Sequence, residues 1–290
     1  MTDIRYLSPR TLDEAISAFA AGGSAARILA GGTDLLVQMR SGAVRPGLIV
    51  DIKKIAEMTA IEETADGGFR VGAAVPGAVL AEHKRFGKAW PGVLEAVNLI
   101  GSTQVQGRAS AGGNLCNGSP AGDSVPAMIA AGAIVTVQGP KGRREMPVEQ
   151  VLAGPGRTNL KPGEILVSFA LPPRPPGSGD AYLRMIPRTE MDIAVVGCGV
   201  SLTLKNGVCT AARVGLGAVA PTVLLVEAAA KALTGSRFEA AALDAAAEAC
   251  RAACRPIDDK RGTIAYRTKI AGVLLKRTAG IAAQRAAGGN

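Results

Sequence analysis

The sequence predicts an α+β protein with two domains, and three observations support this prediction. A chain of 290 residues is long enough to bury two hydrophobic cores. Residues 172–179 are so rich in proline and glycine that they cannot continue a helix or a sheet, and they therefore mark a boundary. After this boundary, three strand-like segments precede three helical ones, an order typical of a small antiparallel sheet covered by helices. We expect one domain at residues 1–175 and a second at residues 180–290.

In the first domain, capping residues and glycines set the expected limits of the elements. Thr11 and Glu14 form a capping box at the start of a helix that a glycine pair ends. Asp66-Gly67-Gly68 is the turn signal of a hairpin between two short strands. A helix is expected over the apolar residues 89–100. Strands are expected at residues 27–30, 48–52, 61–63, 69–72, 133–138, 144–148 and 164–171.

The second domain is expected to hold an antiparallel sheet and a group of helices. Three apolar runs predict its strands, and Lys205-Asn206-Gly207 predicts the turn between the second and the third. The strands are expected at residues 182–186, 194–204 and 210–218, and the helices at residues 223–233, 238–253 and 262–286.

The composition excludes several classes of protein. With 48% hydrophobic and 20% charged residues, the chain is too apolar for a disordered protein. No stretch reaches about 18 consecutive apolar residues, so we expect no membrane span. The first residues lack a basic segment followed by an apolar run, so we expect no secretory signal and a cytoplasmic location.

The net charge of +9 is concentrated toward the C-terminus. From Arg255 onward, eight lysines and arginines stand against two acids, Asp258 and Asp259. Tyr266 is the sole aromatic residue among them, so this segment lacks the aromatic side chains on which the bases of a single-stranded nucleic acid would stack. We expect no nucleic-acid binding, and interpret the basic segment as a solvated helix face or a surface that docks a partner.

Cysteine and histidine indicate neither a disulfide framework nor a metal site. The five cysteines are odd in number and scattered. Cys250 and Cys254 have a helical spacing that could bind a metal, but no histidine is near, and buried thiols are the expectation. Cys116 is likewise expected to be packing material. The single histidine, His83, is expected at the surface, because no site for a general base surrounds it.

Two glycine motifs could hold a phosphate group. The first, Leu29-Ala30-Gly31-Gly32-Thr33-Asp34-Leu35, ends a strand and offers backbone N–H groups with no side chain in the way. It matches neither the P-loop pattern nor GxGxxG. The second, Ser110-Ala111-Gly112-Gly113-Asn114-Leu115, repeats the same chemistry in the same domain. One elongated diphosphate ligand held from both sides would explain the pair, although glycine turns are common in a chain with 37 glycines.

Four segments, in a fixed order, carry a resemblance to a known family. They are Ala30-Gly31-Gly32-Thr33-Asp34-Leu35-Leu36, Ile100-Gly101-Ser102-Thr103-Gln104-Val105, Gly112-Gly113-Asn114-Leu115-Cys116-Asn117-Gly118-Ser119-Pro120-Ala121-Gly122-Asp123 and Asp192-Ile193-Ala194. In this order and spacing the chain resembles, over essentially its whole length, the FAD subunit of the xanthine dehydrogenase and carbon-monoxide dehydrogenase family of molybdenum hydroxylases. Ser110-Ala111 in place of Thr-Ile, and Gln106-Gly107 in place of Arg-Asn, are mild departures.

The resemblance implies an FAD-binding domain of the vanillyl-alcohol-oxidase (PCMH) type. Its two lobes would cover about residues 1–57 and 58–175, and a small α+β C-terminal domain with a three-stranded antiparallel sheet plus helices would cap the flavin. The resemblance also implies that the FAD diphosphate is held by two groups of residues. These are Ile28, Leu29, Ala30, Gly31, Gly32, Thr33, Asp34 and Leu35, and then Ser110, Ala111, Gly112, Gly113 and Asn114.

Further cofactor contacts are implied outside the glycine motifs. Leu99 or Ile100 would lie near the flavin or the adenine, and Leu166 would be an apolar flavin contact. Asp123 would reach another polar part of the cofactor. Arg184 stands where family members often carry a lysine near the isoalloxazine, a departure because a planar guanidinium is not an ammonium. By residue type alone, Asp34 is equally well explained as a surface or capping carboxylate.

The resemblance implies that the chain is the FAD-carrying electron-transfer subunit of a heteromeric molybdenum hydroxylase. A large partner subunit would oxidise the organic substrate at a molybdenum centre. A small partner subunit would pass electrons through two [2Fe–2S] clusters to FAD, and NAD⁺ or another acceptor would receive them. No residue of this chain would be catalytic, and no metal site is expected on it. The alternative is a self-sufficient flavin-dependent oxidoreductase of the same fold, which would need its own acid or base or a covalent flavin attachment.

Overall fold

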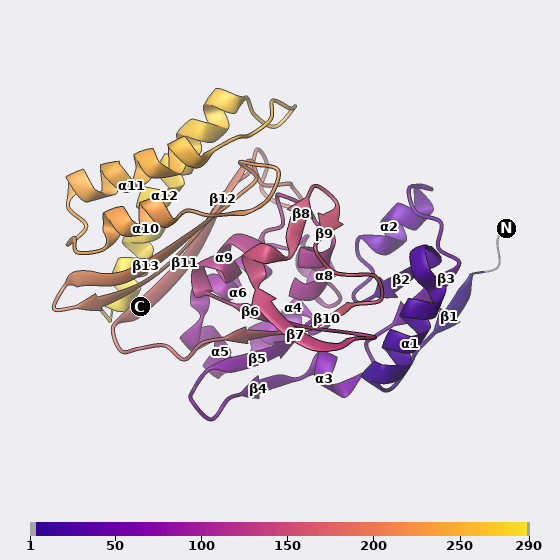
Figure 1. The fold of residues 1–290 in the computed structure, drawn as a ribbon. Helices are drawn as coiled ribbons and strands as arrows, with labels where there is room; N and C mark the ends of the chain where they lie inside the picture. The colour runs from indigo at the N-terminus through magenta and orange to yellow at the C-terminus, as the bar shows by residue number, and fades with distance from the viewer. Residues whose placement is uncertain (1–3, 289–290) are drawn as a thin grey trace.

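In the computed structural model, which describes residues 4–288, three main sheets follow one another along the molecule, each packed against helices (Figure 1). The first lobe lies at one end, the sheet of the second lobe lies in the middle, and the C-terminal sheet with its helices lies at the other end.

The first lobe is a parallel sheet with the strand order β1-β3-β2. Its elements are β1 (Arg5–Leu7), α1 (Leu12–Gly22), η1 (Gly23–Ala25), β2 (Ala26–Leu29), α2 (Leu35–Arg40) and β3 (Leu48–Asp51). The capping box is confirmed, because Thr11 Oγ1 accepts from the backbone N–H of Glu14 and the Glu14 carboxylate accepts from that of Thr11, both at 3.3 Å. The short elements β1 and α2 were not expected from the sequence.

The second lobe is built on an antiparallel sheet with the strand order β4-β5-β10-β6-β7. Its elements are α3 (Ala56–Thr59), β4 (Ile61–Glu63), β5 (Phe69–Gly72), α4 (Gly77–Glu82), α5 (Lys84–Ala89), α6 (Pro91–Val97), α7 (Thr103–Gln106), α8 (Ala111–Cys116), α9 (Ser124–Ala131), β6 (Ile134–Gly139), β7 (Gly142–Pro147), η2 (Val148–Gln150), β8 (Leu152–Gly154), β9 (Arg157–Thr158) and β10 (Ile165–Leu171). The helix expected over residues 89–100 begins only at Pro91, because proline is favoured in the first turn of a helix.

The C-terminal sheet has the order β11-β12-β13-β14. It therefore has one strand, β14, in addition to the three that the sequence predicts. The elements are β11 (Ser178–Met185), β12 (Val196–Lys205), β13 (Val208–Gly217), β14 (Leu224–Leu225), α10 (Glu227–Leu233), α11 (Ala240–Ala253) and α12 (Ile264–Ala286). Leu224 and Leu225 were predicted to be helical, but they pair with the end of β13, and the helix begins after them. Ser178 and Gly179, expected in the linker, already belong to β11.

Glycines allow α9 of the second lobe to lie directly on the C-terminal sheet. A Cβ atom at Gly199 or Gly215 would lie 2.6 Å or 2.2 Å from the carbonyl oxygen of Pro126. Cβ atoms essentially never come this close to another heavy atom. Helix α12 packs on β11 and β12 of this sheet. The buried apolar residues form two clusters, one mostly before and one mostly after the linker. The domain and lobe limits expected from the sequence stay predictions.

Candidate functional site

A cavity of about 620 Å³ is lined by residues from both lobes of the first domain. This volume is within the range of roughly 300–1,000 Å³ that is usual for small-molecule and cofactor sites. Most residues expected to contact FAD line it, namely Ile28, Ala30, Gly31, Gly32, Thr33, Asp34, Leu35, Ile100, Ser110, Gly112, Gly113, Asn114 and Leu166. The other expected residues lie outside the described lining, and their contact with the cofactor stays a prediction: Leu29, Leu99, Ala111, Asp123 and Arg184.

The first glycine motif forms the turn that the sequence predicts. Gly32 has a φ of +77°, a left-handed conformation that glycine adopts without strain. Gly31 is needed for a different reason, since a Cβ atom there would lie 2.0 Å from the carbonyl oxygen of Arg108. The first motif is therefore pressed against the chain that leads into the second.

The turn presents a row of unused hydrogen-bond donors. Within residues 4–288, the backbone N–H groups of Gly31, Gly32, Thr33 and Asp34 donate to no atom of the chain. Consecutive free N–H groups of this kind form an anion-binding concavity. The turn lines the cavity, so a diphosphate placed there would accept from several of them.

The second glycine motif is not a turn, which corrects the expectation. Ser110 is the N-cap of α8, and its Oγ accepts from the backbone N–H of Gly113 at 3.1 Å. A Cβ atom at Gly112 would lie 2.3 Å from the carbonyl oxygen of Ala73, so this glycine allows α8 to pack on the chain that follows β5. At Gly113 a Cβ atom would meet only Ser110 Oγ within 4 Å, in a tight contact of 3.3 Å.

A side-chain hydrogen bond joins the two lobes across the cavity, and sequence reasoning missed it. Gln38 Nε2 on α2 donates to Asn117 Oδ1, just after α8, at 3.0 Å, and both residues line the cavity. Asn117 stands in a segment that carries the family resemblance, whereas Gln38 has no local signal. Asn114 also lines the cavity, and its Oδ1 accepts from Ser124 Oγ at 2.8 Å, which fixes the start of α9.

Several expectations for single residues are corrected or confirmed. Cys116 was expected to be packed, but the residue is exposed and lines the cavity, while desolvation of its thiol raises its pKa to about 12. Cys250 and Cys254 are buried as expected. His83 is half-buried rather than at the surface, and its Nδ1 accepts from the backbone N–H of Phe86 at 3.1 Å, which caps α5. Asp34 is exposed at the N-cap position of α2, where its side chain makes no capping hydrogen bond.

Asp123 and Arg184 form a buried ion pair instead of lining the cavity. Arg184 Nη1 lies 2.7 Å from Asp123 Oδ2, and the Tyr182 hydroxyl donates to Asp123 Oδ1 at 2.9 Å. Burial raises the pKa of Asp123 to about 6, outweighing the attraction of Arg184. Arg184 Nη1 also donates to the carbonyl oxygen of Leu99 at 3.0 Å, next to Ile100 of the cavity wall.

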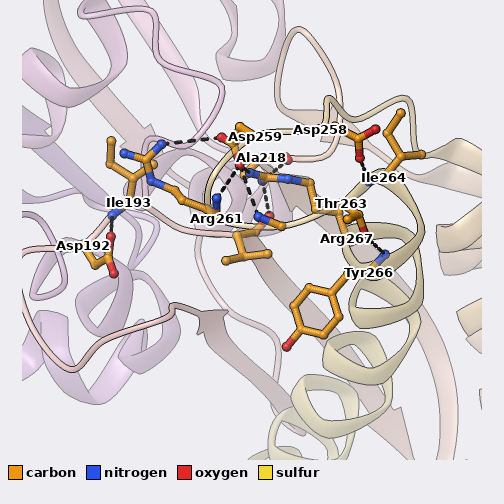
Figure 2. Close-up of polar contacts among 12 residues, drawn as sticks. Asp192, Ile193, Ala218, Asp258, Asp259, Arg261, Thr263, Ile264, Tyr266 and Arg267 are labelled. Carbon is orange, nitrogen blue, oxygen red and sulfur yellow. Dashed lines mark hydrogen bonds and ion pairs between the residues drawn. The ribbon is translucent and has the colours of Figure 1, made fainter.

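Several basic residues of the C-terminal segment pair with other groups of the chain. Arg267 on α12 is 3% exposed, and it donates to the carbonyl oxygens of Val195 and Ala218 and to Asp259 Oδ1, at 2.6, 3.2 and 2.7 Å (Figure 2). Hydrogen bonds from the Arg261 backbone and from Arg267 lower the pKa of Asp259 to about 2. Elsewhere on α12, Lys276 pairs with Asp244, and Arg285 pairs with Glu95. The segment is therefore not a uniformly solvated face, which corrects that interpretation.

The cavity, its row of free N–H groups and its apolar wall residues Ile100 and Leu166 define a protein that binds a cofactor with a diphosphate. Comparison with known proteins agrees. The chain matches the family model described as FAD binding domain in molybdopterin dehydrogenase over residues 2–174. Residues 181–281 match the CO dehydrogenase flavoprotein C-terminal domain.

Individual relatives match the chain from end to end. It is 33% identical to the carbon monoxide dehydrogenase medium chain of Hydrogenophaga pseudoflava, over 97% of this chain and 98% of that one. It is 31% identical to the xanthine dehydrogenase FAD-binding subunit of Escherichia coli O157:H7, over 98% and 97%. The solved structure of reconstituted CO dehydrogenase from Oligotropha carboxidovorans matches with a TM-score of 0.94, 33% identity, and 97% and 98% coverage.

The chain therefore belongs to the family of FAD-binding subunits of molybdopterin dehydrogenases. The resemblance seen in the sequence is confirmed, as are the α+β fold with its FAD-binding domain, FAD as the cofactor and the oxidoreductase class. Among the described helices, none has the length and apolar character needed to cross a membrane. Residues 4–288 contain no group of three or more His, Cys, Asp or Glu side chains arranged to hold a metal ion.

Proposed function

We propose that this chain is the FAD-carrying electron-transfer subunit of a heteromeric molybdenum hydroxylase. A small partner subunit with [2Fe–2S] clusters would supply the electrons. A large partner subunit with a molybdenum cofactor would oxidise the organic substrate, and NAD⁺ or another acceptor would receive the electrons. A cytoplasmic location is part of the same proposal.

The observation that carries this proposal is the cavity between the lobes, with the free N–H groups of the Gly31–Gly32 turn on its wall. The names of the relatives add support, since those proteins are called medium chains and FAD-binding subunits, and the similarity extends over nearly their whole length. When bound, FAD supplies an electron carrier that takes electrons singly or in pairs.

The residues of this chain bind and orient the cofactor. We infer that the N–H groups of residues 31–34 hold the diphosphate from one side, with Gly113 and Asn114 on the other wall of the cavity. Ile100 and Leu166 supply apolar surface for the cofactor rings and exclude water from them. The Gln38–Asn117 hydrogen bond would keep the two lobes together around the cofactor.

Two measurements test the proposal. The purified chain is expected to hold about one FAD, bound non-covalently, so acid precipitation should release the flavin into the supernatant. Yellow colour that stays in the pellet would contradict this mode of binding.

The second measurement addresses the relay role. The chain loaded with FAD is expected to oxidise no hydroxylation substrate alone, and to support that turnover only when co-purified with an iron–sulfur subunit and a molybdenum subunit. Turnover of such a substrate by the metal-free chain with any acceptor would overturn the relay. The self-sufficient flavin-dependent oxidoreductase would then replace it.

A further inference from the structure

Lys53 contacts the chain where the Gly31–Gly32 turn begins. Strands β2 and β3 are parallel, and Leu29 stands opposite Asp51, so the two strands end side by side. Two residues after β3, Lys53 Nζ donates to the carbonyl oxygen of Ala30 at 2.9 Å. Ala30 is the residue that connects β2 to the turn.

The ammonium group of Lys53 is itself held in place. Asp51 Oδ1 lies 2.7 Å from Lys53 Nζ and also accepts from the Lys53 backbone N–H at 3.0 Å. Asp51 Oδ2 accepts from the Tyr6 hydroxyl at 2.5 Å. Burial raises the pKa of Asp51, but the hydrogen bonds from Lys53 and Tyr6 outweigh it and hold this pKa below its usual value. The carboxylate is therefore ionised at neutral pH and keeps Lys53 in one position.

This contact acts on the peptide group that supplies the first free donor of the turn. The carbonyl of Ala30 and the N–H of Gly31 belong to the same peptide, so holding the carbonyl fixes the direction of the N–H. A hydrogen bond from a cation also polarises the peptide and makes its N–H a stronger donor. The other side of Gly31 is closed by the carbonyl of Arg108, so the turn has little room to relax on its own.

We propose that Lys53 is a positioning residue of the FAD diphosphate site, which sets the orientation of the Gly31 N–H through the Ala30 carbonyl. This inference rests on the proposed binding of FAD at that turn. The Lys53 side chain is 28% exposed, so its hydrogen bond to the turn is partly shielded from solvent.

The test compares Lys53→Met with Lys54→Met. Lys54 is the next residue, is exposed, and makes no hydrogen bond or ion pair within the described residues. The apoprotein of each variant is titrated with FAD, and the dissociation constant is read from the quenching of flavin fluorescence. Lys53→Met is expected to weaken FAD binding about tenfold or more, as for a lost hydrogen bond to a charged group, and Lys54→Met is expected to match wild type.

Phosphorus NMR of bound FAD separates positioning from a general loss of stability. The diphosphate resonances are expected to shift in Lys53→Met, while the visible absorption spectrum of the flavin stays as in wild type. Lys53→Arg, which keeps a cationic donor, is expected to restore most of the affinity. If Lys53→Met does not fold, Lys53→Ala, which also removes the donor, gives the same readings.

Three results would overturn the inference. One is wild-type affinity in Lys53→Met, which leaves the proposed function intact. Another is a loss of affinity with unchanged phosphorus resonances, which assigns Lys53 to stability alone. The third is a wild-type chain that binds no FAD, which overturns the proposed function together with the inference.

Discussion

Arg184 Nη1 lies 2.7 Å from Asp123 Oδ2, and this ion pair crosses from one domain to the other. Asp123 precedes α9 of the second lobe, whereas Arg184 stands on β11 of the C-terminal sheet. The side chains are 10% and 5% exposed, so the pair is almost free of solvent. Removing one partner of a buried pair leaves an uncompensated charge, and this cost exceeds what the pair itself contributes.

Arg184→Ala is therefore expected to lower the free energy of unfolding by about 3–5 kcal/mol, measured by denaturant titration of the FAD-loaded chain. The double variant Arg184→Met with Asp123→Asn removes both charges and is expected to lose clearly less than the single one. Equal losses in the two variants would show that the packing of Arg184, and not its charge, determines its contribution to the free energy of unfolding.

The titration of Asp123 predicts a pH dependence of stability. Its pKa is about 6 in the folded chain, raised by burial, and about 3.9 in an unfolded one. Between these values the folded state holds a proton that the unfolded state has released. Stability from this group is thus full below about pH 4 and is lost as the pH rises through 6. Relative to Asp123→Asn, wild type is expected to lose up to about 3 kcal/mol between pH 4 and 7. A difference that does not change with pH would contradict the shift.

Substitutions at two glycines, one where α9 meets the C-terminal sheet and one on the exposed side of α12, are expected to have opposite effects on stability. Gly215→Ala would place a Cβ atom 2.2 Å from the carbonyl oxygen of Pro126, so the domains must shift apart. We expect a loss of about 1–3 kcal/mol or more. Gly280→Ala lies on the exposed side of α12 with no atom within 4 Å of the new Cβ, and it is expected to stabilise by up to about 1 kcal/mol. Thermal unfolding of the two variants checks both signs.

Much of the fold could be predicted because its signals are local. The capping box of Thr11 and Glu14, and the hairpin around Gly67, depend on neighbours within a few residues. Strands β1 and β14 could not be predicted, because such short strands carry no periodicity, and neither has the adjacent hairpin turn that marks the equally short β4. Leu224 and Leu225 stand beside an alanine-rich helix, so local propensity favoured the wrong element.

Most of the residues expected to contact FAD line one cavity, but what holds them in place depends on residues far away in the sequence. The glycines of both motifs were recognised, but Gly31 and Gly112 are required by carbonyl oxygens of Arg108 and Ala73, which no local pattern shows. The bridge from Gln38 to Asn117 joins residues 79 positions apart. The pairing of Asp123 with Arg184 also depends on how the domains meet.

Gly32→Asp and Gly113→Asp are each expected to abolish FAD binding while leaving a folded chain. A carboxylate about 4 Å from the diphosphate, at the surface of a cavity, repels it by about 4 kcal/mol. Gly67→Asp is the control for the first variant, because Gly67 has a φ of +88° in a hairpin away from the cavity. Gly280→Asp is the helical control for the second. The flavin absorbance of each purified protein gives the result, and wild-type FAD content in both site variants would refute the assignment.

Cys116 provides a chemical probe of the cavity. It is exposed, whereas Cys198, Cys209, Cys250 and Cys254 are buried. Desolvation raises the pKa of Cys116 and of Cys198 to about 12 and that of Cys254 to about 11, so these thiols are protonated, and access rather than pKa distinguishes Cys116. A thiol reagent is therefore expected to modify one cysteine of the native apoprotein before the others, at a rate that rises with pH, and all five after unfolding.

Binding of FAD is expected to slow that single reaction at least tenfold, because Cys116 lines the same cavity as Gly32 and Gly113, and a bound cofactor would block access to the thiol. Cys116→Ser should remove that first reaction and keep FAD binding, since the hydroxyl is nearly isosteric with the thiol and the Cys116 side chain makes no hydrogen bond within the described residues. Labelling of the native chain that persists unchanged in Cys116→Ser would place the accessible thiol elsewhere. Equal labelling rates with and without saturating FAD would show that the cofactor lies outside this cavity.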